Sequence, residues 1–110
     1  MADMEWVVDD ALIKGYFVVW VDVLPYASVA GPGVDPVGQA TSYNALMLLE
    51  CASRSSNSRL RCVFNYSSLV DPSNPGSLLP AYSCDGLHLS QSGTDVYSDR
   101  ILSEVRAIAP

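Results

Sequence analysis

Residues 16–25 form the run YFVVWVDVLP, which is apolar almost throughout and ends at a proline. Its β-branched and aromatic residues favour a strand, and the run is far too short to cross a bilayer. A strand that is apolar on both faces is typical of a parallel sheet covered by helices on each side. This run therefore predicts an α/β layered fold in which it is an interior strand.

The rest of the chain alternates helix and strand signals around this run. Helices are predicted over 4–14 and 41–55, with a last helix capped by Ser90 or Ser92. A second strand is predicted over 59–70, with loops over 26–40 and 71–80. The residues expected on buried faces are Trp6, Val7, Ala11, Leu12, Trp20, Leu46, Leu48, Leu49, Cys51, Leu60, Cys62, Phe64, Tyr97, Ile101, Val105 and Ile108.

A sheet of two parallel strands offers too little area for three helices to cover, and it has two unpaired edges. The chain of 110 residues suits one small domain. We therefore expect residues 1–110 to be one partial domain, the C-terminal part of a larger α/β domain that lacks its N-terminal strands. Charged residues make up only 16% of the chain, against about 25% in a typical domain. The exposed sheet edge is thus expected to contact a partner chain or the missing N-terminal half.

The charge balance excludes one class of partner. The net charge is −6, with twelve acidic residues against six basic ones. A nucleic-acid binder needs clustered Lys and Arg to displace counterions, so we expect neither nucleic acid nor an anionic membrane surface as a partner. No signal peptide or membrane span is predicted.

The three cysteines, Cys51, Cys62 and Cys84, cannot all pair within the chain. The simpler hypothesis is that they are buried free thiols. The alternative is a secretory or luminal parent protein, with one disulfide here and one partner cysteine elsewhere. The sequon Asn65-Tyr66-Ser67 favours that alternative, although it falls in a predicted strand. No cofactor or metal is expected, because one histidine and unclustered acids make no ligand set.

The only histidine, His88, follows Asp85 by three residues in the stretch YSCDGLHLSQSG, 82–93. A carboxylate at this spacing can fold back across a turn and accept a hydrogen bond from the imidazole Nδ1–H. Gly86 permits the tight turn. The loop precedes the last helix, beyond the carboxyl end of the last strand, where α/β sheets bind ligands. A loop histidine beside a turn-forming aspartate is the simpler alternative.

The stretch DGLHLSQSG resembles the last block of the SGNH (GDSL-type) hydrolase superfamily, Asp-Gly-x-His-x-Ser-x-x-Gly before a terminal helix. VVWVDVLP is similar to that family's penultimate strand, SYNALMLLECA to the next helix and LRCVFNYSSLV to the last strand. DGLHLS and YNALMLL are also similar to the branch of sialic-acid or polysaccharide O-acetyltransferases and PC-esterases. The resemblance covers nearly all of residues 16–108.

The resemblance implies a flavodoxin-like three-layer α/β/α domain and acyl transfer by a catalytic triad. Asp85 would orient His88, and His88 would take the proton of a serine that attacks an ester of an acylated small molecule or carbohydrate. The family's Gly-Asp-Ser nucleophile block and its oxyanion glycine and asparagine have no counterpart here. No nucleophile and no oxyanion donor is identified, so we expect this chain to be inactive alone.

Two further hypotheses remain open. The chain is either a non-catalytic binding or interaction module that keeps the C-terminal half of the fold, or a truncated product without a function of its own. GPGVDPVG, 31–38, has neither the spacing of a phosphate-binding loop nor that of a dinucleotide turn. It is therefore interpreted as a surface loop.

Overall fold

The computed structural model describes residues 2–108. In chain order it contains α1 (Ala2–Ile13), β1 (Val18–Val21), a 3₁₀ turn (Ala27–Val29), α2 (Pro36–Ser53), β2 (Leu60–Val63), α3 (Tyr66–Leu69), β3 (Val70–Asp71), β4 (Asn74–Leu78) and α4 (Gln91–Ile108). The predicted domain of residues 1–110 also includes residue 1 and residues 109–110, which lie outside the described residues.

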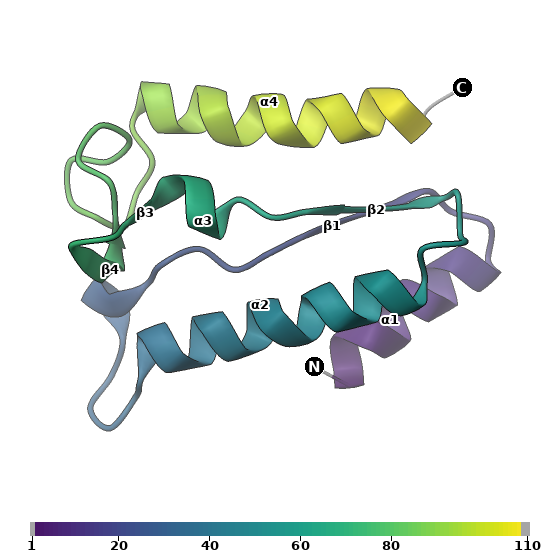
Figure 1. Cartoon of the computed structure of the whole chain (residues 1–110), viewed down its shortest axis with the longest axis horizontal. Coiled ribbons are helices and arrows are strands. Elements are labelled where there is room, and N and C mark those ends of the chain that lie inside the picture. The colour runs from purple at the N-terminus through teal and green to yellow at the C-terminus, as the bar shows by residue number, and fades with distance from the viewer. Residues whose placement is uncertain (1, 109–110) are drawn as a thin grey trace.

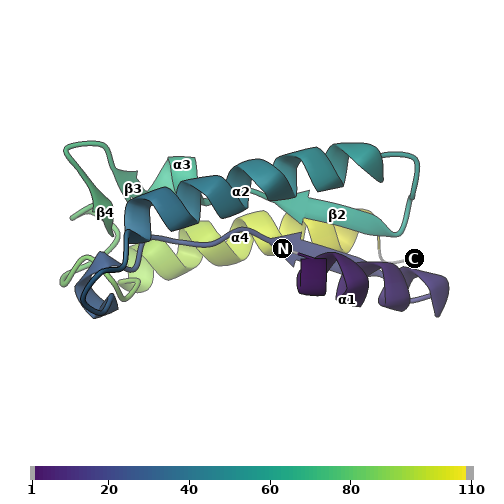
Figure 2. The ribbon, with the colours of Figure 1, turned by 90° about the horizontal axis from the view of Figure 1, so that it is seen from below.

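The layered α/β prediction is confirmed. Strands β1 and β2 pair in parallel, with Val18 opposite Leu60 and Val21 opposite Val63. Helix α4 contacts both strands from one face, while α1 and α2 lie on the other face (Figures 1 and 2). Among the described residues this sheet has only these two strands. Each strand therefore has one edge without a neighbour, as the sequence predicted.

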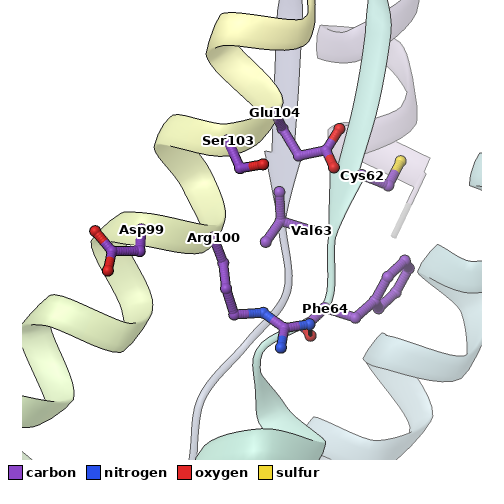
Figure 3. A pocket seen from close by; sticks show the side chains of 7 residues that line it. All are labelled: Cys62, Val63, Phe64, Asp99, Arg100, Ser103 and Glu104. Carbon is purple, nitrogen blue, oxygen red and sulfur yellow. Dashed lines mark hydrogen bonds between the residues drawn. The ribbon is translucent and has the colours of Figure 1, made fainter.

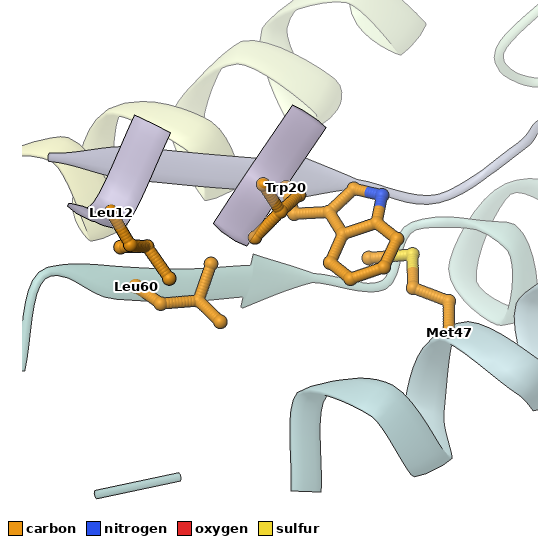
Figure 4. Packing of buried hydrophobic residues seen from close by; sticks show 5 residues of the cluster. Leu12, Trp20, Met47 and Leu60 are labelled. Carbon is orange, nitrogen blue, oxygen red and sulfur yellow. The ribbon is translucent and has the colours of Figure 1, made fainter. Parts of the chain in front are cut away.

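The core lies between the sheet and the α1–α2 layer. Trp20 and Met47 are almost fully buried there together with Val8, Leu12 and Leu60 (Figure 4). The prediction that Trp6 and Val7 belong to the core is wrong, because these residues are 69% and 52% exposed. The outer surface of α1 has no covering layer in the described residues.

The predicted buried face of the second helix is also wrong. Leu46, Leu48 and Leu49 are exposed, and α2 instead buries Ala40 and Met47. The helix also starts earlier than predicted, at Pro36 rather than within 41–55. Asp35 caps that start by accepting the N–H of Gly38 at 2.9 Å, and proline suits the first helical turn.

The second strand ends earlier than predicted. The Asp22 carboxylate accepts the backbone N–H groups of Asn65 and Tyr66, each at 2.9 Å. These bonds take the backbone out of the parallel ladder and start α3, so residues 64–70 do not continue the strand. Asp22 itself is buried, and burial raises the pKa of its carboxyl despite these hydrogen bonds. The sequon is not accessible in this fold, because Asn65 is fully buried.

The predicted loop over 71–80 holds a short antiparallel pair, β3 with β4. The predicted cap of the last helix is confirmed: the Ser90 hydroxyl accepts the N–H of Gly93 at 3.2 Å. Of its predicted apolar stripe, Tyr97, Ile101 and Ile108 are half-buried, whereas Val105 is exposed.

The cysteines do not follow the simpler hypothesis of three buried thiols. Cys51 of α2 and Cys62 of β2 form a disulfide, and Cys84 is free and exposed. Arg54 joins the same layers, because its guanidinium binds Asp9 of α1 and Glu50 of α2. The disulfide therefore links α2 to the sheet covalently, and the ion pairs of Arg54 link α2 to α1.

Removal of this disulfide is expected to destabilise the fold. The double variant Cys51→Ala/Cys62→Ala should lose about 2–3 kcal/mol of unfolding free energy, because the bond closes a short loop of the unfolded chain. Urea denaturation followed by circular dichroism measures this loss. Cys84→Ser is the matched control and should leave the midpoint unchanged. Equal midpoints for the double variant and the native chain would contradict the assignment.

Candidate functional site

The stretch 82–93 forms a loop at the end of the molecule where β1 and β2 have their carboxyl ends (Figure 1). Backbone hydrogen bonds attach it on two sides. Leu78 of β4 donates to the Gly86 carbonyl at 2.8 Å, and Ser90 donates to the Tyr82 carbonyl at 2.7 Å. The loop is therefore fastened both to the hairpin and across its own base.

Two glycines allow this loop to close. Gly86 has a φ of +80°, which favours glycine, and a Cβ there would also lie 2.9 Å from the Ser77 hydroxyl oxygen. Gly93 sits in the first turn of α4, where a Cβ would meet the Tyr82 carbonyl oxygen. Both positions match the glycines on which the resemblance rests.

The Asp85 carboxylate binds two different partners with its two oxygens. Oδ1 accepts the backbone N–H of Leu87 at 2.9 Å and of His88 at 2.7 Å. Oδ2 lies 2.6 Å from Nδ1 of the His88 ring. One oxygen thus folds the backbone of the loop, and the other holds the imidazole.

These contacts keep the Asp85 carboxyl ionised. Hydrogen bonds from the His88 ring, then from the backbone N–H groups of His88 and Leu87, hold the pKa of the Asp85 carboxyl well below its usual range. An ionised carboxylate accepts only, so the hydrogen between the two side chains belongs to Nδ1. The neutral imidazole then has its lone pair on Nε2. The ring is 78% exposed, which leaves this nitrogen open to solvent.

No serine in the described part of the chain serves Nε2. None of the hydrogen bonds within residues 2–108 involves His88 Nε2. The serines of 53–58 lie at the end of α2 and in the turn after it. Ser67 and Ser68 lie in α3, not in the predicted strand. Ser83, a buried side chain inside the loop, was not among the predicted site residues. One serine in a serine-rich chain has no sequence signal.

A groove of about 450 Å³ lies between β2 and α4 and includes no residue of the 82–93 loop. Two of its charged side chains have protein partners: Arg100 donates to the Phe64 carbonyl at 2.9 Å, and Glu104 lies 3.8 Å from Arg61. Figure 3 shows Arg100 reaching from the helix toward the end of the strand. These contacts attach α4 to β2 and give the groove a structural role.

Residues 2–108 contain neither a candidate metal cluster nor a helix that could span a membrane. No group of three or more His, Cys, Asp and Glu side chains gathers into a possible metal site. Within the same range, no helix combines the length and the apolar composition that a membrane span needs.

Comparison with known proteins relates the chain to one class of enzyme. No protein-family model and no curated protein matches the sequence. A crystal structure from Bacteroides fragilis, of a protein with a provisional acylhydrolase assignment, matches with a TM-score of 0.75 and 25% identity. The match covers 96% of this chain and 49% of that one, so the chain spans about half the length of the protein it resembles. The fold is therefore that of an acylhydrolase-like α/β domain.

The pH response of Asp85 tests this geometry. Because its native pKa lies below the unfolded value of about 3.9, its stabilising contribution is complete above that value and is lost as pH falls through the native pKa. A carbon-13 NMR titration should show the Asp85 carboxyl still ionised well below pH 4. His88→Gln should raise the midpoint toward the ordinary value. An ordinary midpoint in the native chain would contradict the hydrogen bonds described here.

Proposed function

We propose that the chain supplies the acid–base half of an SGNH-type acyl-transfer site. The observation that carries this proposal is the 2.6 Å contact between Asp85 Oδ2 and His88 Nδ1, with the ring otherwise exposed. The acylhydrolase-like fold supports the reaction class. The residue pattern of the loop, including its two constrained glycines, supports the assignment to the SGNH superfamily.

The proposed chemistry needs one proton acceptor and one orienting group. His88 Nε2 takes the proton of a serine hydroxyl while the serine oxygen attacks the ester carbonyl. Asp85 stabilises the imidazolium that forms. When the tetrahedral intermediate collapses, the imidazolium returns the proton to the leaving alcohol, and an acyl-serine remains. Water or a sugar hydroxyl then attacks the acyl-serine while His88 accepts its proton, and the imidazolium returns that proton to the released serine oxygen.

The nucleophile and the oxyanion donors come, in this proposal, from outside residues 1–110. The support is that Nε2 has no serine partner in residues 2–108, while the acylhydrolase relative has about as much chain again. The chain is then one partial domain. Without the serine and the oxyanion donors, most of the catalytic stabilisation is missing.

The unpaired edge of β1 is the proposed docking position for that other half. A groove of about 320 Å³ lies between this strand and α1, lined by Met4, Val7, Val8, Ala11 and Val18–Val21. Its lining is almost wholly apolar, and the neighbouring backbone of β1 has N–H and C=O groups free to pair. A further parallel strand would satisfy both.

The proposed substrate is an ester of an acylated small molecule or carbohydrate. The similarity of DGLHLS and YNALMLL to O-acetyltransferases and PC-esterases supports the carbohydrate ester. The Cys51–Cys62 disulfide supports a secretory or luminal parent protein, because disulfides persist in oxidising compartments.

A non-catalytic binding module is the second candidate. The observation that favours it is the same apolar groove beside β1, which would then bind a partner chain without completing a catalytic site. The two candidates differ in whether a reactive serine depends on His88.

Labelling of the native gene product with a fluorophosphonate probe tests the proposal. With an epitope tag inserted after Pro110 at the native locus, we expect one labelled serine in the captured polypeptide or its bound partner. His88→Gln should reduce the labelling at least a hundredfold, because the base is removed. Ser92→Ala, at an exposed position in the first turn of α4, is the control and should label normally.

The 110-residue chain alone should not label. A specifically labelled serine in the isolated chain would contradict the external nucleophile. Absence of any labelled serine in the native capture, or labelling that is unaffected by His88→Gln, would refute the catalytic proposal and favour the binding module.

A further inference from the structure

Ser83 lies two residues before Asp85, and its side chain is at the centre of the loop. Only 4% of the residue is exposed. The hydroxyl donates to the His88 backbone carbonyl at 2.6 Å and accepts the N–H of Gly86 at 2.9 Å. Each of these bonds requires a separately placed partner, one that accepts and one that donates.

The two bonds span the part of the loop that presents the acid and the base. Gly86 follows Asp85 directly, and the His88 carbonyl belongs to the histidine itself. The Ser83 oxygen also lies 3.2 Å from Asp85 Oδ1. The single hydroxyl hydrogen goes to the closer carbonyl, so this third contact is the weakest of the three.

The same geometry excludes Ser83 as the nucleophile. Its hydroxyl bonds a backbone carbonyl rather than the imidazole, and its burial leaves no approach for an ester. A serine that attacks an ester needs its proton directed at a base and its oxygen open to the substrate. Ser83 has neither property.

We propose that Ser83 is a positioning residue, which fixes the loop backbone so that the His88 ring meets Asp85 Oδ2. The Asp85 side chain alone leaves the His88 carbonyl and the Gly86 N–H without partners in this loop. Ser83 bonds both groups. It thereby holds the His88 backbone in the position from which the ring reaches the Asp85 carboxylate. The proposal rests on the proposed function for its catalytic meaning, although the positioning itself is a property of the chain alone.

Proton NMR of the full 110-residue chain tests this role. Ser83→Ala should accelerate amide exchange of Gly86 about tenfold, as expected for one lost buried hydrogen bond. It should also weaken or broaden the downfield His88 Nδ1–H signal, which reports the contact with Asp85. A merely structural serine would change stability and leave this signal in place.

Ser90→Ala is the matched control, because Ser90 caps α4 at the other end of the loop and is not bonded to Asp85 or His88 through its hydroxyl. It should lower the unfolding midpoint and preserve the Nδ1–H signal. An unchanged signal in Ser83→Ala, or an equal loss in both variants, would overturn the proposal.

The native chain provides a check that needs no variant. The Ser83 hydroxyl proton should exchange slowly and show a nuclear Overhauser effect to the Gly86 amide proton. Absence of this Overhauser effect would overturn the proposal even if Ser83→Ala failed to fold. Because these signals do not depend on an external serine, failure of the catalytic proposal in fluorophosphonate labelling would be recognised separately.

Discussion

The Asp85 carboxylate is the group on which the proposed site depends. One oxygen binds the backbone of its own loop, and the other binds the His88 ring. The loop shape and the histidine orientation are therefore set by the same side chain, within four residues of sequence. This local construction explains how a short loop can hold an ordered acid–base pair. The contacts that organise the pair come from the loop and from its neighbour β4, whereas β1 is not involved.

The rest of the architecture is arranged around a sheet that has two strands in the described residues. Helices cover both faces of β1 and β2, the Cys51–Cys62 disulfide ties one helical layer to the sheet, and Arg100 ties α4 to the end of β2. An apolar groove lies between α1 and β1, and further exposed apolar residues lie on α2 and α4. The fold is thus supported internally at the site and is open where the proposed other half would pack.

Features with short-range causes were predictable from the sequence. The parallel strand at 16–25, the Ser90 cap and the Asp85–His88 spacing each depend on residues a few positions apart. The end of β2 was not predictable, because it is imposed by Asp22, about forty residues earlier in the chain. Exposure of Trp6 depends on which layers surround α1, and the disulfide depends on the register of α2 against β2. The start of α2 is a different case: the Asp35-Pro36 signal is local, but the surrounding glycines and prolines were interpreted as a loop.

We infer that Asp85 holds His88 in the form whose Nε2 can accept a proton. Nitrogen-15 NMR of the neutral imidazole measures this most directly, because protonated and unprotonated ring nitrogens have widely separated shifts. His88 is the only histidine, so the two signals need no separation from others. We expect a protonated Nδ1 and an unprotonated Nε2 in the native chain. A ring with the hydrogen on Nε2, as in a free histidine side chain, would contradict it.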